Sequence, residues 1–190
     1  MAGGWSLRLD EVSEYAWQLD VFSKEECSKI IKYGKKQKSE KATTFSKVLD
    51  MRKNTNICWL SPDKEIDWVF QRLTSVILNL NEKYFKFNLF ALNEPLQFTH
   101  YHRKGACYKK HVDKAYNQSV RKLSISVQLS DESSYDGCEL HLHNDEHPHV
   151  AKKDLGSLTA FPSYTLHEVT SLKKGERFAL VTWVTGEGFK

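Results

Sequence analysis

The sequence of 190 residues has little of several features that mark particular classes of protein. Its four prolines and nine glycines exclude a collagenous or low-complexity chain. No apolar run approaches the roughly 20 residues that a membrane-spanning helix needs. Residues 1–15 carry no basic head followed by an apolar stretch, so we expect no secretory signal. A net charge of only +4, with 10 Phe, 8 Tyr and 5 Trp, is not the composition of a disordered chain, which leaves a soluble globular domain.

Cysteine is also sparse, and no two cysteines form a C-x-x-C pair. In a chain of this size we expect Cys27, Cys58, Cys107 and Cys138 to be reduced rather than a disulfide framework, which favours a cytoplasmic setting. The densest basic stretch, residues 32–41, is typical of an exposed helix end and loop. Its alternative interpretation is a phosphate-binding patch.

Two amphipathic helices are predicted in the first half of the chain. Residues 23–26 form a capping-box pattern, and the apolar stripe that follows stops at Gly34. Ser61-Pro62 gives a second start signal, and apolar residues then recur at three- and four-residue spacing over 66–80. A helix with one broad apolar face must lie against a large flat surface, so we expect this second helix to pack on a sheet.

From residue 85 onward the hydrophobic period changes from 3.6 to 2, which predicts strands. About eight strands with turn signals between them indicate an antiparallel sandwich or barrel. Alternation of apolar residues with Ser124, Ser126 and Gln128 gives one strand a helix-facing side and a polar side that faces solvent or a wet cavity. We expect one domain over 1–190, helical to about residue 84 and a strand core from about 85. The clearest strand runs are 87–92, 96–102, 123–130, 139–143, 157–161 and 177–184.

The motif H-V-D at 111–113 places two metal-binding side chains on the same side of an extended segment. With His167 it supplies two histidines and a carboxylate, the facial triad of non-haem Fe(II) oxygenases. A second motif, H-N-D at 143–145, is separated from His167 by room for only about one hairpin. We interpret the histidine-rich stretch 141–149 as a polar strand end and turn rather than a second metal site. Arg177 opens the last strand and offers a planar cation for a cosubstrate carboxylate.

Six motifs occur together and in order along the chain, and they carry a resemblance to a known family. With them, the stretch from about residue 17 to 189 resembles the 2-oxoglutarate- and Fe(II)-dependent dioxygenases of the prolyl 4-hydroxylase-like (PKHD-type) group, especially the short forms found in phages. The resemblance implies an α+β, mostly β fold: a double-stranded β-helix (jelly-roll) core with N-terminal helices packed on one sheet. The motifs are LQFTHY at 96–101, GACYKKHVD at 105–113, RKLSISVQLSD at 121–131, YDGCEL at 135–140, GSLTAFPSYTLHEV at 156–169 and GERFALVTW at 175–183.

The resemblance also implies which residues carry the chemistry. His111, Asp113 and His167 would be the ligands of Fe(II), with 2-oxoglutarate and O₂ as cosubstrates and a need for ascorbate left open. Arg177 would bind the distal carboxylate of 2-oxoglutarate, and Tyr101 would point toward this cosubstrate, although a core aromatic is an equal interpretation of Tyr101.

Further residues are expected around the same pocket. Gln128 stands where relatives often place a residue that touches the cosubstrate carboxylate. Val181 and Trp183 share the face of Arg177 and would wall the substrate pocket, which core packing would explain equally well. Tyr108 would reach the substrate or cap its strand.

Two short segments depart from the family pattern. Gly137-Cys138-Glu139-Leu140 stands where relatives usually carry Gly-Gly-Glu-Leu, so a side chain is placed at a tight turn whose backbone geometry is left open. Ser171-Leu172 replaces a frequent Pro-Val pair, away from the expected iron. All three expected ligands and the arginine remain, which argues against an inactive copy.

The implied activity is hydroxylation of a prolyl residue in a protein or peptide, with release of succinate and CO₂. Nothing in the sequence independently selects proline. Three alternatives remain: the same chemistry on a nucleic-acid base or free amino acid, a non-catalytic 2-oxoglutarate-binding barrel, and a structural zinc protein, which has the least support. We expect no membrane partner and a cytoplasmic location, in a host cell if the protein is phage-encoded; the oligomeric state is open. The segment 41–56 is expected to be a lid or a strand with a poorly ordered connection.

Overall fold

The computed structural model describes residues 12–41, 51–113 and 120–188, which contain two α-helices and fifteen strands. The helices are α1 (Lys24–Lys36) and α2 (Asp67–Leu80); a π-helical turn, η1 (Asn81–Phe85), extends α2, and a 3₁₀ turn, η2 (Glu132–Ser134), lies in the second half. The strands are β1 (Ala16–Gln18), β2 (Glu40–Lys41), β3 (Arg52–Lys53), β4 (Thr55–Leu60), β5 (Leu89–Ala91), β6 (Leu96–Tyr101), β7 (Cys107–His111), β8 (Arg121–Gln128), β9 (Tyr135–Gly137), β10 (Leu140–Leu142), β11 (His149–Val150), β12 (Leu158–Pro162), β13 (His167–Val169), β14 (Leu172–Gly175) and β15 (Arg177–Gly186).

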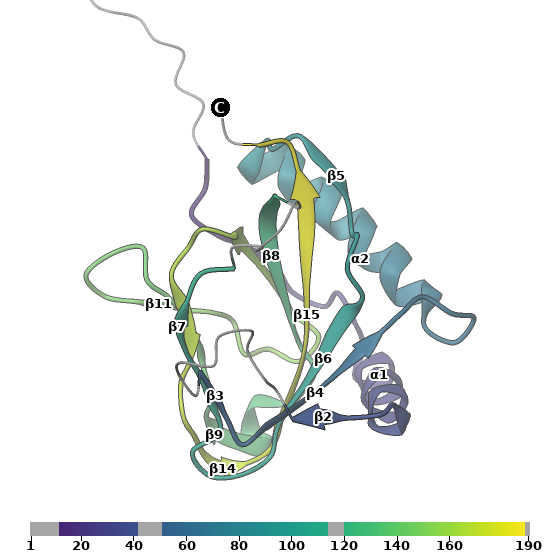
Figure 1. Cartoon of the computed structure of the whole chain (residues 1–190), viewed down its shortest axis with the longest axis vertical. Helices are drawn as coiled ribbons and strands as arrows, with labels where there is room; N and C mark the ends of the chain where they lie inside the picture. The colour runs from purple at the N-terminus through teal and green to yellow at the C-terminus, as the bar shows by residue number, and fades with distance from the viewer. Residues whose placement is uncertain (1–11, 42–50, 114–119, 189–190) are drawn as a thin grey trace, which may run out of the picture.

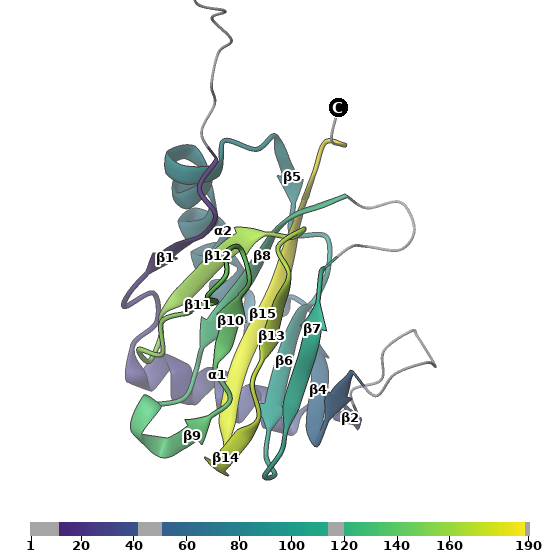
Figure 2. The ribbon, with the colours of Figure 1, turned by 90° about the vertical axis from the view of Figure 1, so that its left-hand side faces the viewer.

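Two antiparallel sheets face each other, and the helices cover the outer side of the larger one (Figure 1). The larger sheet has eight strands in the order β1-β12-β8-β15-β6-β4-β2, with β5 paired to β15. The smaller sheet has five strands in the order β11-β10-β13-β7-β3, and β14 and β9 form a separate pair. In Figure 2 the small sheet lies in front of the large one, with α1 and α2 behind both. The interior between the sheets is thus separated from the helical core by the thickness of one sheet.

Helix α1 begins as its sequence predicts but ends later. Ser23 accepts a hydrogen bond from the backbone N–H of Glu26, and the Glu26 carboxylate accepts one from the N–H of Ser23, so the predicted capping box is confirmed. The predicted stop at Gly34 is wrong, because the helix continues to Lys36. A glycine is needed at this position for another reason: a Cβ at Gly34 would lie 2.7 Å from the ring of Phe98 on β6.

Helix α2 packs on the large sheet as expected, but its predicted start at Ser61-Pro62 is wrong. The preceding turn is held by Asp63, whose carboxylate accepts hydrogen bonds from the backbone N–H groups of Glu65 and Ile66, and the helix begins at Asp67. Its buried face joins one continuous apolar core with the apolar side of β8, which is formed by Leu123, Ile125, Val127 and Leu129. The predicted division of β8 into an apolar face and a polar face is therefore confirmed.

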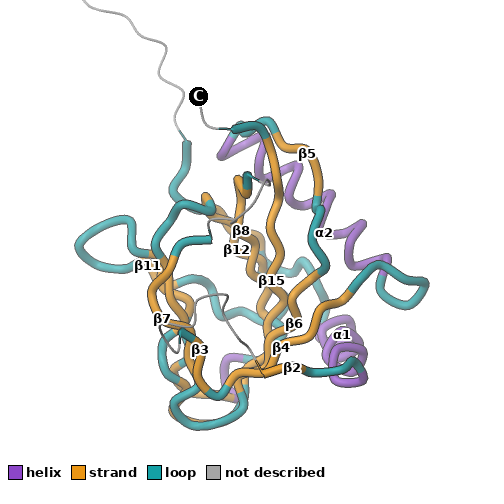
Figure 3. Tube along the Cα trace, viewed as in Figure 1, coloured by secondary structure: helices purple, strands orange, loops and turns teal. Residues whose placement is uncertain are grey.

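The six predicted strand runs are all found, with ends that shift by up to two residues. The sequence missed strand β4, and with it the fact that the first 84 residues also contribute β1, β2 and β3 to the sheets. Strand β4 is buried at four of its six positions rather than at alternate ones, because it lies within the large sheet, beside β6 (Figure 3). Without alternation, its sequence gives no strand periodicity.

Two global expectations can be compared with the described residues. No helix among them is long and apolar enough to cross a membrane. All four cysteines are free, in agreement with the expected absence of a disulfide framework.

The expected lid over 41–56 lies partly outside the described residues, and its described part contributes β3 and the start of β4.

We expect Gly34→Ala to lower the free energy of unfolding by about 1–3 kcal/mol, because the added methyl group would be driven into the Phe98 ring. Helix propensity alone predicts the opposite sign, a gain of up to about 1 kcal/mol. Urea denaturation measures the difference. The control is Ser28→Ala on the exposed side of α1, which should stay within about 0.5 kcal/mol of the parent; equal stability of the two variants would contradict the close contact.

Candidate metal centre and cosubstrate pocket

Pairing of two strands in the small sheet brings the predicted metal ligands together. His111 ends β7 and His167 opens β13, and the two are direct cross-strand partners. Asp113 follows β7, where its backbone N–H bonds the carbonyl of Ser163 at 3.0 Å. The carboxylate of Asp113 lies 3.5 Å from Nε2 of His111 and 3.4 Å from Nε2 of His167. One ligand atom from each residue lies within 4.8 Å of the others, and no other such group of three or more occurs among the described residues.

Hydrogen bonds to backbone carbonyls fix both imidazole rings for metal binding. Nδ1 of His111 lies 2.7 Å from the carbonyl of Lys109, and Nδ1 of His167 lies 2.9 Å from the carbonyl of Thr165. A carbonyl only accepts, so each Nδ1 carries the proton and donates it. Each Nε2 is therefore left with a free lone pair directed toward Asp113, which is the arrangement of a metal-binding histidine.

The Asp113 carboxylate is held in its charged form. Burial alone raises the pKa of this carboxyl, but the hydrogen bond from His111 and the charge of His167, which act when these rings also carry a proton on Nε2, outweigh burial and keep the pKa below its ordinary value. A bound metal ion would take the place of these protons. The hydroxyl of Ser124 donates to Asp113 at 2.7 Å and lies 3.0 Å from the hydroxyl of Ser163. Burial lowers the pKa of His167, which favours the neutral ring. A charged carboxylate beside neutral imidazoles fits a divalent cation such as Fe(II) bound on one face.

A pocket of about 40 Å³ opens beside the triad, in the space between the two sheets. Beyond the triad, the sequence analysis named Tyr101, Tyr108, Arg177, Val181 and Trp183, and all five line this pocket. Tyr108 stacks on the ring of His111 with centroids 3.6 Å apart. The structure thus brings together every named site residue except Gln128, which lines a second cavity behind Arg177.

Arg177 is the only arginine that lines both this pocket and the small cavity behind it, among the described residues. It is 5% exposed, and none of the described salt bridges involves it. Its guanidinium lies 5.5 Å from the ring of its cross-strand partner Tyr101. A buried guanidinium with no carboxylate partner is costly unless an anion occupies the pocket, so the site is electrostatically suited to a carboxylate ligand.

Gln128 acts on the guanidinium rather than on the pocket. Its amide oxygen accepts a hydrogen bond of 3.0 Å from Nε of Arg177, and its amide nitrogen donates to the carbonyl of Ser130 and the hydroxyl of Tyr135. The amide is therefore fully used, and it lines the cavity behind Arg177 instead of the pocket that holds the triad. Gln128 thus bonds Nε of the guanidinium and does not reach the pocket beside the triad, which gives it an orienting role.

Arg52 and Thr99 also line the pocket, and no sequence motif marked either of them as a site residue. Arg52 lies on β3 opposite Tyr108, with its guanidinium 4.0 Å from the tyrosine ring. Five buried side-chain atoms lack a hydrogen-bond partner among the described residues, and three of them belong to pocket residues: Nε of Arg52, Oγ1 of Thr99 and Nε1 of Trp183. Buried polar atoms are seldom left unpaired, so their clustering here indicates a polar ligand.

Cys138 lies in the tight turn whose backbone geometry the sequence analysis left open. Its φ is +54°, a left-handed conformation that favours glycine, and its side chain is fully buried beside Arg177 in the rear cavity. The neighbouring Gly137 also has a positive φ, and a Cβ there would lie 2.3 Å from the carbonyl of Ser171. Cys138 thus adopts, with a side chain, a backbone conformation that glycine would adopt more readily.

The second H-x-D motif does not form a metal site. Nε2 of His143 lies 3.0 Å from the carboxylate of Glu168, and Nε2 of His141 lies 3.2 Å from that of Glu139. Residues 143–148 form bends and turns between β10 and β11. The interpretation of this stretch as a polar strand end and turn is therefore confirmed.

Comparison with known proteins shows which proteins this chain is similar to. Residues 96–185 match the model of the 2OG-Fe(II) oxygenase superfamily. A PKHD-type hydroxylase of Teredinibacter turnerae is 38% identical over 96 residues, which cover 47% of this chain and 42% of the relative. A PKHD-type hydroxylase of Cupriavidus pinatubonensis is 31% identical over 121 residues, which cover 60% of this chain and 53% of the relative. The chain thus spans about half the length of these curated relatives.

Solved structures share the fold at low sequence identity. A Pseudomonas putida prolyl-4-hydroxylase superposes with a TM-score of 0.71 and 19% identity, covering 93% of this chain and 94% of the other. A Trichoplax adhaerens prolyl hydroxylase, solved with a hypoxia-inducible-factor peptide fragment, gives a TM-score of 0.75 and 15% identity, covering 92% and 84%. These likenesses confirm the predicted double-stranded β-helix.

Residues 96–185, which match the 2OG-Fe(II) oxygenase superfamily model, contain the His111–Asp113–His167 triad and Arg177. The fold is similar to that of prolyl hydroxylases, and the matched segments are similar in sequence to PKHD-type hydroxylases.

We expect Gln128→Leu to weaken 2-oxoglutarate binding about tenfold, the effect of one lost hydrogen bond of about 1.4 kcal/mol to a charged group. Fe(II) binding should be unchanged, because Gln128 touches no ligand of the triad. Calorimetric titration of the Fe(II)-loaded protein under anaerobic conditions measures both affinities. Gln71→Leu on α2 makes the same chemical change away from the site and serves as the control; unchanged 2-oxoglutarate affinity in Gln128→Leu would remove the orienting role.

Proposed function

We propose that this protein is a 2-oxoglutarate- and Fe(II)-dependent hydroxylase whose substrate is a prolyl residue of a protein or peptide. The observation that carries the proposal is the pairing, in one enclosed pocket, of the His111–Asp113–His167 triad with the buried and carboxylate-free guanidinium of Arg177. The matched family and the PKHD-type relatives support the reaction class. The prolyl substrate is supported by the names of proteins that share the fold.

When bound, Fe(II) supplies the oxidation: O₂ and 2-oxoglutarate are converted to succinate and CO₂ while one oxygen atom enters a C–H bond of the substrate. The protein's residues supply everything that positions these reactants. His111, Asp113 and His167 would hold the metal from one side, and the carbonyls of Lys109 and Thr165 keep the two rings in the required tautomer.

The other end of 2-oxoglutarate would be held by Arg177, whose terminal nitrogens form a planar fork that matches a carboxylate. Gln128 keeps this fork in place through Nε, and Tyr101 covers it from the neighbouring strand. Burial raises the pKa of Tyr101, so its phenol stays protonated and remains a hydrogen-bond donor. The distal carboxylate of 2-oxoglutarate would therefore be surrounded by hydrogen-bond donors.

The remaining wall keeps water away from the reacting centre. Trp183 is 4% exposed and lies under the guanidinium of Arg121, which is itself paired with Glu94. Tyr108, on the same strand as His111, stacks on its ring. A shielded pocket of this kind protects a reactive centre from side reactions with water.

An anaerobic titration with Fe(II) and 2-oxoglutarate tests the centre directly. The chelated keto acid should give a visible metal-to-ligand charge-transfer band in the parent protein and none in His167→Ala, because the variant lacks one of three ligands. His147→Ala, which changes an exposed histidine of the turn after β10, should retain the band. A folded parent protein without the band would instead be a non-catalytic barrel.

Turnover separates the roles of the ligands and the arginine. Asp113→Ala should abolish succinate production, whereas Arg177→Ala should retain Fe(II) and raise the 2-oxoglutarate concentration needed for half-maximal rate by about 100-fold, which corresponds to an interaction of about 3 kcal/mol. Succinate assays over a range of 2-oxoglutarate concentrations measure this difference. Full succinate production by Asp113→Ala would overturn the ligand assignment.

The substrate class needs its own measurement. A proline-rich peptide should gain the mass of one oxygen atom per modified proline, and a matched peptide with alanine at these positions should gain none. Mass spectrometry after incubation with Fe(II), 2-oxoglutarate and ascorbate measures the change. Oxidation of a single-stranded oligonucleotide or a free amino acid, with the peptide unmodified, would keep the chemistry and replace the substrate.

A further inference from the structure

A groove of about 300 Å³ lies on the helical side of the protein, between α1 and the start of α2. It is separate from the metal centre, because the two helices lie on the outer face of the large sheet and the triad lies between the sheets (Figure 1). The groove has a larger volume than the pocket beside the triad, and none of the residues proposed for catalysis lines it. The proposed catalytic activity therefore does not explain the groove.

Three lysines of α1 form one rim of the groove. Lys29, Lys32 and Lys36 are spaced by three and four residues, so they lie on the same side of the helix, and all three are exposed. Lys36 makes a loose ion pair of 3.9 Å with Glu65 across the groove, with both side chains more than half exposed. The salt bridges among the described residues include neither Lys29 nor Lys32. The rim thus carries two positive charges without an ion-pair partner.

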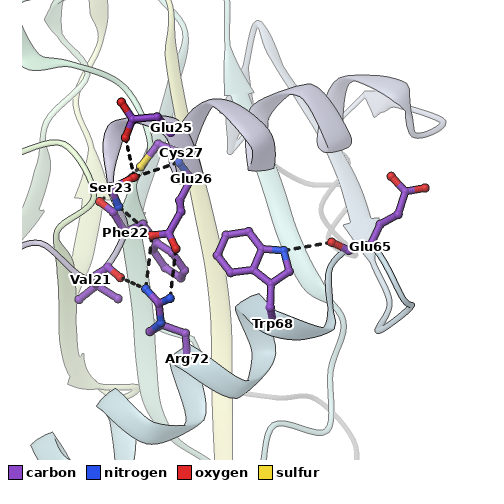
Figure 4. Close-up of polar contacts among 9 residues, drawn as sticks. All are labelled: Val21, Phe22, Ser23, Glu25, Glu26, Cys27, Glu65, Trp68 and Arg72. Carbon is purple, nitrogen blue, oxygen red and sulfur yellow. Dashed lines mark hydrogen bonds and ion pairs between the residues drawn. The ribbon is translucent and has the colours of Figure 1, made fainter.

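The neighbouring carboxylates of Glu26 and Asp63 are engaged at the helix ends and do not line the groove. Glu26 is held by Arg72 at 3.1 Å and by the backbone N–H of Ser23 (Figure 4). Asp63 accepts the hydroxyl of Tyr33 and two backbone N–H groups of the turn before α2. The lining of the groove thus holds three lysines and the single carboxylate of Glu65.

The floor of the groove is apolar. It consists of the buried Ile66 and the half-buried Trp68, whose ring extends from α2 toward α1 (Figure 4). The indole N–H donates to the carbonyl of Glu65 at 3.0 Å, so the polar atom of the ring is already satisfied. One edge of the ring packs against Phe22 at 5.8 Å. The surface left for a ligand is therefore an aromatic face beside lysine ammonium groups.

We propose that this groove is a docking site for an acidic peptide segment of a partner protein. An apolar side chain of the segment would lie on Trp68 and Ile66, and its carboxylates would pair with Lys29 and Lys32. The charge complementarity favours a peptide over a nucleic acid, because a single-stranded nucleic acid needs a longer basic track with several stacking platforms. This groove has a single, half-buried indole, and its opposite wall carries the Glu65 carboxylate. The inference does not depend on the proposed catalytic activity.

Fluorescence polarisation with a labelled peptide tests the proposal on the full chain, without added metal. The probe is a peptide of about twelve residues in which glutamates flank a central Leu-Phe pair; its partner probe carries glutamine in place of glutamate. The acidic probe should bind saturably and should lose about tenfold in affinity on the double change Lys29→Glu and Lys32→Glu, because both rim contacts become repulsive. Binding should also weaken as salt is raised.

The control variant carries Lys24→Glu and Lys83→Glu, which make the same change in net charge at exposed lysines outside the groove. It should bind the acidic probe within about twofold of the parent protein. All four lysines are exposed, so both variants should fold, which circular dichroism checks. Equal loss in both variants, or equal binding of the glutamine probe, would overturn the proposal. The groove would instead be assigned to nucleic acid if the peptide did not bind and an oligothymidine bound the parent protein but lost affinity for the Lys29→Glu, Lys32→Glu variant.

Discussion

The architecture depends on a single strand that must satisfy two different environments. Along β8, apolar side chains alternate with polar ones, so Leu123 and Ile125 enter the helical core while Ser124 and Gln128 face the interior between the sheets. Ser124 then supports the metal-binding carboxylate, and Gln128 supports the guanidinium. A shift of one residue in the pairing of this strand would exchange the two faces and destroy both the core and the site.

The site also balances buried charges that its protein groups do not fully compensate. Asp113 is surrounded by two imidazoles and a hydroxyl, which favour its negative form and leave lone pairs for a cation. Arg177 is surrounded by an amide, an aromatic ring and a thiol-bearing turn, which leave it without an anion. The two ends of one pocket therefore have opposite electrostatic needs, and a ligand that coordinates a metal at one end and carries a carboxylate at the other satisfies both.

Much of this site could be predicted from the sequence, because its residues lie in patterns of short range. The i, i+2 spacing of the H-V-D motif and the opening of β15 at Arg177 place side chains on known faces of strands. Other features depend on contacts that no local pattern encodes. Gly34 is required by the ring of Phe98 rather than by the end of α1, and Arg52 reaches the pocket because β3 pairs with β7. The role of Gln128 likewise follows from the position of Arg177, which is 49 residues away along the chain.

The order of strands in the large sheet has a consequence for how the protein is made. Strand β15 is the last of the described strands to leave the ribosome, yet it lies between β8 and β6 and pairs with both. Until it emerges, these two strands have unpaired edges and the helices have only part of a surface to cover. Arg177 arrives with the same strand, so the metal ligands are synthesised before the group that would hold the cosubstrate. Folding of the large sheet therefore waits for β15, and nascent chains are exposed to edge-to-edge association until this strand has emerged.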